Sequence, residues 1–311
     1  MLASASLLSA ALAPALGWWV LAVALPTAAA SGWTARPIPR ERSHRHHLPP
    51  LPEEADDRMA DDLEHAFKRG ELFLHYQPVV DLRTGEPVVA EALLRWRRNG
   101  ELVSPALFVP VAEHHGLIDA IGAWVLDEAV AQAAEWQQGS DQPLVVSVNV
   151  SALQLCAPEF PAIVDETLRR HSLDPHHLMV ELTESVEVTD DPKVVRAIRE
   201  LKWRGVQIAI DDFGTGYASL GSLHLLPLDV VKVDRSFIDN VSDGDGDDSQ
   251  IVDAVVQLAH RLQLQVVAEG VEDAATVEAL SELGCDRVQG FYFARPGDPS
   301  QHPFIVTPLS R

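Results

Sequence analysis

The chain has 311 residues, of which 47% are hydrophobic, and this is sufficient for one large barrel or two modest domains with a packed core. The formal net charge of −22 argues against a nucleic-acid polymer as a partner, because basic side chains dominate binding to a phosphate backbone. Cys156 and Cys285 are far apart in the sequence, and we predict reduced packing residues instead of a disulfide or a zinc site.

The first 30 residues are predicted to be a hydrophobic membrane anchor or a signal-like segment. Residues 5–30 carry no charge and are long enough to cross a bilayer. Arginines begin only at Arg36, so the positive-inside rule predicts a cytoplasmic domain tethered to the inner face of the plasma membrane. Two alternatives stay open. One is a signal peptide with a cleavage region at residues 28–30 but without a basic start, and the other is a remnant of a longer membrane region or a misassigned start.

Residues 31–54 are rich in Pro, Arg and His and are predicted to form a linker to a domain that covers residues 55–311. The linker histidines, His44, His46 and His47, are expected to be solvated and not to bind a metal. From about Asp57 the apolar residues recur at helical spacing, and Gly70 is the expected end of this helix.

Strand and helix patterns alternate after Gly70. The predicted strands are 72–77, 88–96, 144–149, 178–181, 206–211, 230–233, 265–269 and 287–289. The predicted helices include one capped by Asp191 and ended by Gly205 and one over residues 273–284. Another is predicted from the apolar repeat Ile251, Val255, Leu258, Ala259 and Leu262. Eight strands alternating with helices predict an α/β fold, a (β/α)₈ TIM-like barrel preceded by the hydrophobic N-terminal segment. A doubly wound sheet is the alternative.

The stretch from Val206 to Gly216 is a strand pattern that ends in two adjacent carboxylates, Asp211 and Asp212. Charge is costly inside a protein, so paired acids at the end of a buried strand indicate a site. Adjacent carboxylates repel each other unless a cation lies between them, and hard cations such as Mg²⁺ prefer oxygen ligands. The alternative interpretation is a turn with an acidic helix cap.

Other polar residues also fall at the ends of predicted strands, where the active site of a (β/α)₈ barrel lies. The whole set is Glu91, Asn149, Glu181, Asp211, Asp212, Lys232, Glu269 and Gln289. The set contains no Cys or His, and oxygen ligation favours Mg²⁺ or Mn²⁺. The carboxylates exceed what one Mg²⁺ takes from a protein, so we expect two ions that share a bridging aspartate. Such pairs suit in-line hydrolysis, and the residues therefore indicate a metal-dependent phosphoester hydrolase.

The order of these motifs resembles that of the EAL-domain cyclic di-GMP phosphodiesterases. Residues 90–96 contain the Glu-Ala-Leu signature, and the resemblance covers about Asp57 to Pro296. The other matching motifs are Tyr76-Gln77-Pro78, Asn149-Val150-Ser151, Glu181-Leu182-Thr183-Glu184, Asp211 to Gly216, Lys232-Val233-Asp234, Glu269-Gly270-Val271-Glu272 and Gln289-Gly290. The resemblance implies hydrolysis of cyclic di-GMP to linear pGpG in bacterial signalling, by in-line attack of a bridging water or hydroxide. It also implies a modified barrel, two Mg²⁺ or Mn²⁺ ions and a homodimer.

The resemblance also assigns roles to individual residues. The expected metal ligands are Glu91, Asn149, Glu181 and Asp211 for the first ion and Asp211, Asp212 and Glu269 for the second. The expected catalytic residues are Glu269, Lys232 and Asp212; Lys232 would orient the attacking water or stabilise the developing charge. Whether Glu269 is a general base or only a ligand stays open. Gln77, Arg95 and Gln289 are expected to face the substrate, and Glu184, Glu272 and Asp234 to support the active-site loop and the ligands.

Two other functions are compatible with such a domain. A receptor would bind cyclic di-GMP without turnover, but family members of this kind have lost metal ligands, and here every ligand position is filled. A signalling adaptor would use the barrel for protein contacts alone. His114 and His115 touch no expected ligand position and are expected to lie at a helix end or on the surface.

Overall fold

Nine strands and nine α-helices make up the part of the chain that the computed structural model describes, residues 52–138, 144–183, 191–214, 226–243 and 246–301. The predicted anchor, the linker up to residue 51 and Glu184 lie outside these residues, so the predictions made for them stay predictions. Among the described helices, none is both long enough and apolar enough to cross a membrane.

The strands are β1 Leu72–Asp81, β2 Pro87–Arg98, β3 Glu101–Val103, β4 Val145–Asn149, β5 Leu178–Thr183, β6 Gln207–Phe213, β7 Val230–Val233, β8 Gln265–Ala268 and β9 Arg287–Val288. The helices are α1 Glu53–Arg69, α2 Pro105–His114, α3 Ile118–Gln137, α4 Ala152–Cys156, α5 Phe160–His171, α7 Pro192–Trp203, α8 Arg235–Ile238, α9 Asp247–Arg261 and α10 Ala274–Glu282. Three short 3₁₀ helices are η1 Pro175–His177, η2 Val241–Asp243 and η3 Pro299–Gln301.

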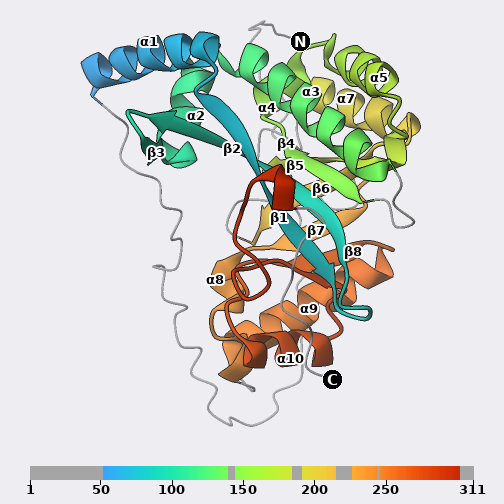
Figure 1. Ribbon diagram of the computed structural model, residues 1–311. Helices are drawn as coiled ribbons and strands as arrows, with labels where there is room; N and C mark the ends of the chain where they lie inside the picture. The colour runs from blue at the N-terminus through green and yellow to red at the C-terminus, as the bar shows by residue number, and fades with distance from the viewer. Residues whose placement is uncertain (1–51, 139–143, 184–190, 215–225, 244–245, 302–311) are drawn as a thin grey trace, which may run out of the picture. The chain divides into compact units, whose positions relative to one another are not determined.

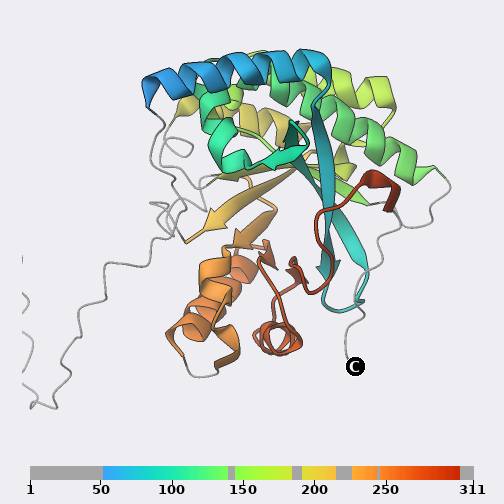
Figure 2. The same ribbon diagram turned by 60° about the vertical axis from the view of Figure 1, so that its left-hand side comes forward.

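Eight of the strands close into a barrel, which confirms the predicted fold class. The sheet runs in the order β1-β9-β8-β7-β6-β5-β4-β2, and β1 pairs with β2 to close the ring. The strands from β4 to β9 run parallel to β2, whereas β1 is antiparallel to both of its neighbours. β3, which the sequence did not reveal, extends β2 as a short antiparallel strand outside the ring. Figures 1 and 2 show α8, α9 and α10 on the opposite side of the barrel from α3, α5 and α7.

The expected alternation of strand and helix is wrong for the first two strands, which form an antiparallel hairpin. β1 runs on to Asp81, and β2 begins at Pro87. The side chain of Asp81 accepts hydrogen bonds from the amides of Arg83 and Thr84, and Gly85 adopts φ 77° in the turn. A parallel connection needs a dozen or more residues, so the short spacing leaves room only for a hairpin.

Local sequence signals set the ends of several helices. α1 ends at Gly70, whose φ of 70° lets its amide and that of Glu71 cap the last turn. Asp191 caps α7 by accepting a hydrogen bond from the amide of Lys193, as the sequence predicts. Helix α1 begins at Glu53, a few residues before the expected start near Asp57.

The predicted apolar repeat of α9 matches its buried face only in part. Ala259 is buried, and Val255 and Leu258 pack against the core, whereas Ile251 is 41% exposed and Leu262 is 37% exposed. The structure also buries Val252 and Val256. Apolar residues occur at helical spacing along both stripes, so periodicity alone does not distinguish them.

Two separate apolar clusters stabilise the barrel. The larger lies between the strands and the surrounding helices. The smaller comes from six different strands and therefore fills the barrel interior; its residues are Val79, Val89, Met179, Ala209, Val230 and Val267. Side chains alternate between the two faces of a strand, so a residue two positions away from one of these six also points inward. Toward the carboxyl end of β2 and its parallel strands, this is the residue two positions later in the chain, and in the antiparallel β1 it is the residue two positions earlier. Those residues are Gln77, Glu91, Glu181, Asp211, Lys232 and Glu269, so the barrel alternation itself aims the predicted site at one end of the interior.

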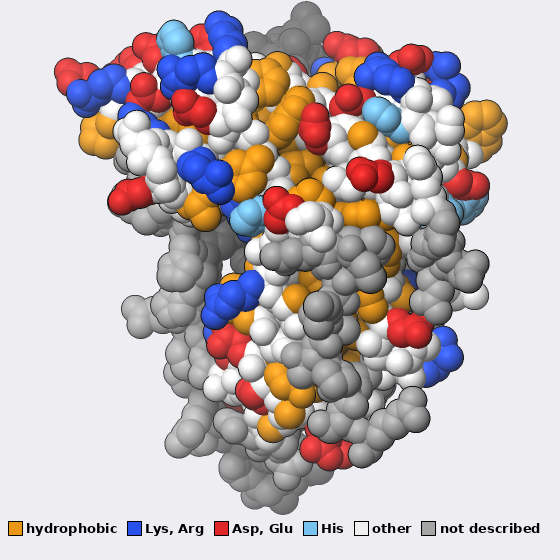
Figure 3. All heavy atoms as spheres, viewed as in Figure 1, with side chains coloured by type: hydrophobic (Ala, Val, Ile, Leu, Met, Phe, Trp, Pro, Cys, Tyr) orange, Lys and Arg blue, Asp and Glu red, His pale blue; other side chains and the backbone are white. Residues whose placement is uncertain are grey.

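The outer surface carries both signs of charge. On the face in Figure 3, basic and acidic side chains are interspersed over the upper helices and do not form a single basic patch. The expectation that a nucleic-acid polymer is not a partner stays a prediction.

Candidate active site

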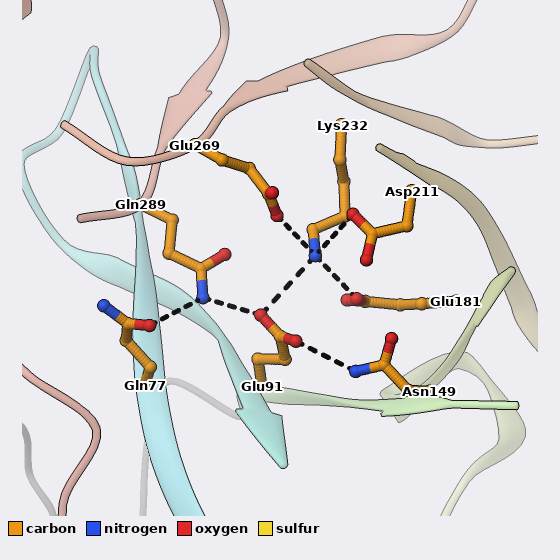
Figure 4. A network of polar contacts seen from close by, with 8 residues as sticks. All are labelled: Gln77, Glu91, Asn149, Glu181, Asp211, Lys232, Glu269 and Gln289. Carbon is orange, nitrogen blue, oxygen red and sulfur yellow. Dashed lines mark hydrogen bonds and ion pairs between the residues drawn. The ribbon is translucent and has the colours of Figure 1, made fainter. Parts of the chain in front are cut away.

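Lys232 lies at the centre of four carboxylates. Its Nζ is 2.6 Å from Glu181 Oε2, 2.6 Å from Glu269 Oε1, 3.1 Å from Asp211 Oδ1 and 3.5 Å from Glu91 Oε2. These side chains come from separate strands and from the residue after β8, and they converge in Figure 4. The Lys232 side chain is only 2% exposed, so solvent screens these interactions little.

Amide side chains complete the network. Asn149 Nδ2 donates to Glu91 Oε1 at 3.0 Å, and Gln289 Nε2 donates to Glu91 Oε2 at 2.6 Å. Gln289 Nε2 also lies 3.2 Å from Gln77 Oε1, and Gln77 Nε2 donates to the carbonyl of Ala294. Each oxygen of Glu91 therefore has a donor, which fixes the orientation of this carboxylate (Figure 4).

A backbone irregularity brings Asp211 and Asp212 to the same side of β6. Consecutive strand residues normally point to opposite faces. Here the pairing of β6 with β7 shifts register between Ile210 and Phe213, and Asp212 adopts φ 54°. A left-handed non-glycine residue is uncommon, and such strain is concentrated at functional sites. As a result, one carboxylate oxygen each from Asp211, Asp212 and Glu269 lie within 4.8 Å of one another.

Burial and charge shift the pKa values of the central groups. Burial raises the pKa of Glu181 to about 8, and Glu91 and Asp211 add to this rise while Lys232 opposes it. Burial and the charge of Asp211 hold the pKa of Glu269 well above its ordinary value. Burial alone would raise the pKa of Glu91, but Lys232 and the donors Gln289 and Asn149 outweigh it and lower that pKa. The four carboxylates hold the pKa of Lys232 well above its usual range in spite of burial.

The residues present fit divalent cations. The four acidic side chains around Lys232 offer carboxylate oxygens as ligands, and their combined charge when ionised exceeds that of one ammonium group. The buried Oδ1 of Asp211 has no hydrogen-bond donor in the described structure, because the nearby Nζ lies outside hydrogen-bond geometry. A cation offsets the excess negative charge and would return Glu181 and Glu269 to their ionised forms.

Two cavities meet at this cluster. The smaller, of about 180 Å³, is lined by Glu91, Asp211, Glu269, Arg235 and Phe291 among others. The larger, of about 480 Å³, reaches from Asp211 to α2 and α3. Its lining includes Arg95, Asn149 and Asp212 together with apolar side chains. Because Asp211 lines both, the carboxylate cluster lies between two compartments.

The matching family model is that of the EAL domain, and it covers residues 60–296. The chain belongs to the EAL domain family. The bifunctional diguanylate cyclase/cyclic di-GMP phosphodiesterase MucR of Pseudomonas aeruginosa is 45% identical over 240 residues, which are 77% of this chain and 35% of MucR. Signaling protein YkoW of Bacillus subtilis is 41% identical over 250 residues, 78% of this chain and 30% of YkoW. The chain thus spans about a third of the length of these relatives.

Solved EAL structures share the fold of this chain. The PaMucR phosphodiesterase in complex with c-di-GMP has a TM-score of 0.74 and 44% identity, and covers 78% of this chain and 99% of its own. The EAL domain of Mycobacterium smegmatis DcpA has a TM-score of 0.65 and 37% identity, and covers 77% and 99%. The EAL barrel is therefore the architecture of the described part of this chain.

Not every residue expected at the site joins the central network. Arg95 lines the larger cavity, and its Nη1 donates to the carbonyl of Leu94. Glu272 lines the smaller cavity and pairs with Arg235 Nη1 at 2.7 Å. Asp234 caps α8 by accepting a hydrogen bond from the amide of Ser236, so its observed role is in the helix start after β7. Glu184 lies outside the described residues.

Sequence reasoning missed Arg235 and the role of Gly290. Arg235 follows Asp234 directly, so its place beyond the end of β7 was a signal for a cavity residue. A Cβ atom on Gly290 would lie 2.0 Å from the carbonyl oxygen of Val271, which means that only glycine fits there. Gly290 thereby lets the backbone after Gln289 pass close to the segment after Glu269.

Proposed function

We propose that this chain is a metal-dependent phosphodiesterase that hydrolyses cyclic di-GMP to linear pGpG. The observation that carries the proposal is the convergence of Glu91, Glu181, Asp211 and Glu269 on Lys232 inside an EAL barrel. A related phosphodiesterase structure, PaMucR, is described as a complex with c-di-GMP, and this supports the choice of substrate.

The shape of the site suits a ligand that has one nucleoside on each side of a phosphodiester. A cyclic dinucleotide carries two purines joined by two phosphodiesters, and the cluster lies between two cavities. We assign the phosphodiester to the carboxylate cluster and one nucleoside to each cavity. Arg95 would bind a phosphate oxygen pair as a planar fork, which lysine cannot do. Gln77 and Gln289 would face the substrate from the barrel wall.

Glu91, Asn149, Glu181 and Asp211 would hold one divalent cation, and Asp211, Asp212 and Glu269 a second. When bound, Mg²⁺ or Mn²⁺ would activate water and offset the charge of the phosphoryl oxygens. Glu269, ionised once the cations are bound, would either accept the proton of the attacking water or serve only as a ligand. Lys232 would keep Glu269 and Glu181 oriented and place positive charge beside the developing anion. A homodimer and a tether through residues 5–30 remain part of the proposal.

The test is turnover of cyclic di-GMP by the purified full chain with Mg²⁺ or Mn²⁺, with and without a chelator. We expect pGpG as the product, separated by chromatography, and no product with chelator. Glu91→Gln keeps the size of the side chain and is expected to abolish turnover. The matched control is Glu101→Gln, which changes an exposed glutamate of β3 and should leave the rate unchanged.

Tight binding of cyclic di-GMP without turnover in either metal would favour a receptor. Unchanged turnover by Glu91→Gln would contradict the assignment of this cluster. Absence of both binding and turnover would favour an adaptor whose barrel serves protein contacts alone.

A further inference from the structure

A second group of metal-ligating side chains lies outside the barrel, where the first turn of α1 meets the end of α2. His114 Nδ1 and His115 Nε2 each lie 2.9 Å from Asp56 Oδ2. Asp57 Oδ1 lies 3.9 Å from His115 Nε2. The ligand atoms of Asp56, His114 and His115 all fall within 4.8 Å of one another.

The local backbone explains how two consecutive histidines face one carboxylate. Neighbouring residues inside a helix point in different directions. Helix α2 ends at His114, His115 is its C-cap with φ −95° and ψ 6°, and Gly116 adopts φ 69°. The two imidazole rings consequently lie 4.9 Å apart, centroid to centroid. Asp56 belongs to the first turn of α1 and faces the end of α2, and its side chain is only 17% exposed.

The donor set differs in kind from that of the barrel cluster. Two imidazole nitrogens and two carboxylates are a donor set that suits Zn²⁺, whereas Mg²⁺ prefers oxygen ligands alone. Ligand atoms around tetrahedral zinc are roughly 3.3 Å apart, given bond lengths of about 2.0–2.1 Å. Asp56 Oδ2 lies 2.9 Å from each imidazole nitrogen, somewhat closer than this value, so a bound cation would separate these atoms slightly. Asp57 Oδ1 is 3.9 Å from His115 Nε2, and its side chain is 67% exposed, so Asp57 would complete the set by a change of rotamer. Two neutral imidazoles with two carboxylates also carry the charge that balances one divalent cation.

Other histidine–carboxylate pairs in the described structure involve one imidazole only. His260 pairs with Asp286, and His176 pairs with Asp174. A single pair is a common surface hydrogen bond. Here two imidazoles point at the same carboxylate oxygen, and a second carboxylate lies beside them. One cation bound among these side chains can replace the hydrogen bonds that join them.

We propose that Asp56, His114 and His115, with Asp57 as the fourth donor, bind Zn²⁺ and so fasten the first turn of α1 to the end of α2. Helix α2 also forms a wall of the larger cavity through Pro105, Val109 and Glu113. The bound cation therefore stabilises that wall from outside. This site is separate from the barrel cluster and does not depend on the proposed hydrolysis.

The test uses full-length protein in which His44, His46 and His47 are changed to alanine, so that the linker supplies no imidazole. The protein is stripped of metal, kept in excess Mg²⁺ to load the barrel cluster, and given one equivalent of Zn²⁺. X-ray absorption at the zinc edge then reports imidazole scattering. The barrel cluster contains no histidine, so an imidazole signal separates the two sites.

We expect imidazole ligation in the parent protein and its loss in the double variant His114→Ala/His115→Ala, together with loss of one tightly bound zinc equivalent. The matched double variant His176→Ala/His260→Ala removes two exposed histidines and is expected to keep both. Zn²⁺ should raise the melting temperature of the parent and of this control but not of the double variant.

Zinc bound without imidazole in the parent, or an imidazole signal retained after loss of His114 and His115, would overturn the proposal. The variant Asp56→Asn is the control for a folding defect in the histidine variant. It retains a side chain of the same size and is expected to weaken zinc binding while far-UV circular dichroism stays unchanged. Full zinc affinity in Asp56→Asn would also overturn the proposal.

Discussion

Lys232 Nζ lies 2.6 Å from Glu181 Oε2, and both side chains are almost completely buried. Lys232 is at the same time the shared partner of three further carboxylates. A buried charge cluster of this kind depends on its central cation, because removing one partner leaves the others uncompensated.

We predict that Lys232→Met strongly destabilises the protein in chelator. Loss of one partner of a buried ion pair costs about 3–5 kcal/mol, and here four carboxylates lose the same partner. Excess Mg²⁺ should reduce the loss, because the cation offsets the same charges. Urea denaturation measures both effects. Lys68→Met is the control: its exposed pair with Glu64 is worth at most about 1 kcal/mol.

The stability of the metal-free protein should fall as pH rises. Burial, with Glu91 and Asp211, raises the pKa of Glu181 to about 8 against the opposing charge of Lys232. A glutamate in the unfolded chain has a pKa of about 4.3. Between these values the folded state retains a proton that the unfolded state has lost, so a higher pH favours unfolding.

Urea denaturation in chelator at several pH values between about 5 and about 8 measures this slope. Glu181→Gln is expected to flatten it, and the exposed Glu282→Gln is expected to keep the wild-type slope. The affinity for Mg²⁺ should rise over the same interval, because the cation competes with the proton. A stability that rises with pH in chelator would contradict the raised pKa of Glu181.

We predict that Asp212→Asn lowers metal affinity and turnover without unfolding the protein. Asparagine tolerates the left-handed backbone at φ 54°, so the irregularity in β6 is retained while the charge is lost. Asp212→Val should in addition lower the melting temperature, since a β-branched residue is strained there. Calorimetry with Mn²⁺ and a thermal melt separate the two effects; equal stability of both variants would argue against backbone strain.

Gly290→Ala is expected to lower both the stability of the protein and its affinity for metal. The added methyl group would meet the backbone of Val271, and overpacking costs about 1–3 kcal/mol. Because the displaced segment carries Gln289, metal affinity should fall together with stability. Gly246→Ala is the control: space is open there, so the change should cost less than about 1 kcal/mol through the weaker N-cap and leave metal affinity unchanged. Normal Mn²⁺ binding by Gly290→Ala would show that the close contact does not support the site.

Two tryptophans provide a test of the core. Trp96 is fully buried and packs edge-to-face on Phe108, so Trp96→Ala should cost about 3–5 kcal/mol. Trp203 is 86% exposed, and Trp203→Ala is expected to change the free energy of unfolding by less than about 0.5 kcal/mol. Urea denaturation of the two variants compares them directly, and a similar loss in both would be inconsistent with the packing described.

Much of the barrel was predictable because parallel strands are short apolar runs with polar residues at their ends. All eight predicted strands begin within one residue of the observed ones, seven of them also end within two residues, and β7 matches at both ends. The hairpin was missed because Leu72 and Val88 begin runs that look alike, while the antiparallel pairing depends on the short turn near Gly85. The buried face of α9 was found only in part because its apolar residues are periodic along two adjacent stripes.

The candidate site was predictable to the level of which residues gather, but not how. Sequence places Lys232 in the same candidate set as Glu91, Glu181 and Asp211, yet it does not reveal that Lys232 pairs with every one of these carboxylates. Nor does it reveal the bulge that aligns Asp212 with its neighbour. Both depend on the closed barrel, in which the stagger between strands decides the side chains that meet.

The hydrogen bond from Gln289 to Glu91 joins residues 198 positions apart in the sequence. It forms between the second strand and the last, on the two sides of the closing hairpin. During synthesis on a ribosome, the pocket therefore cannot assemble until the final strand has emerged. A premature stop before β9 would leave the ring open between β8 and β1 and would deprive Glu91 of the donor Gln289, so such a partial chain would hold an incomplete site.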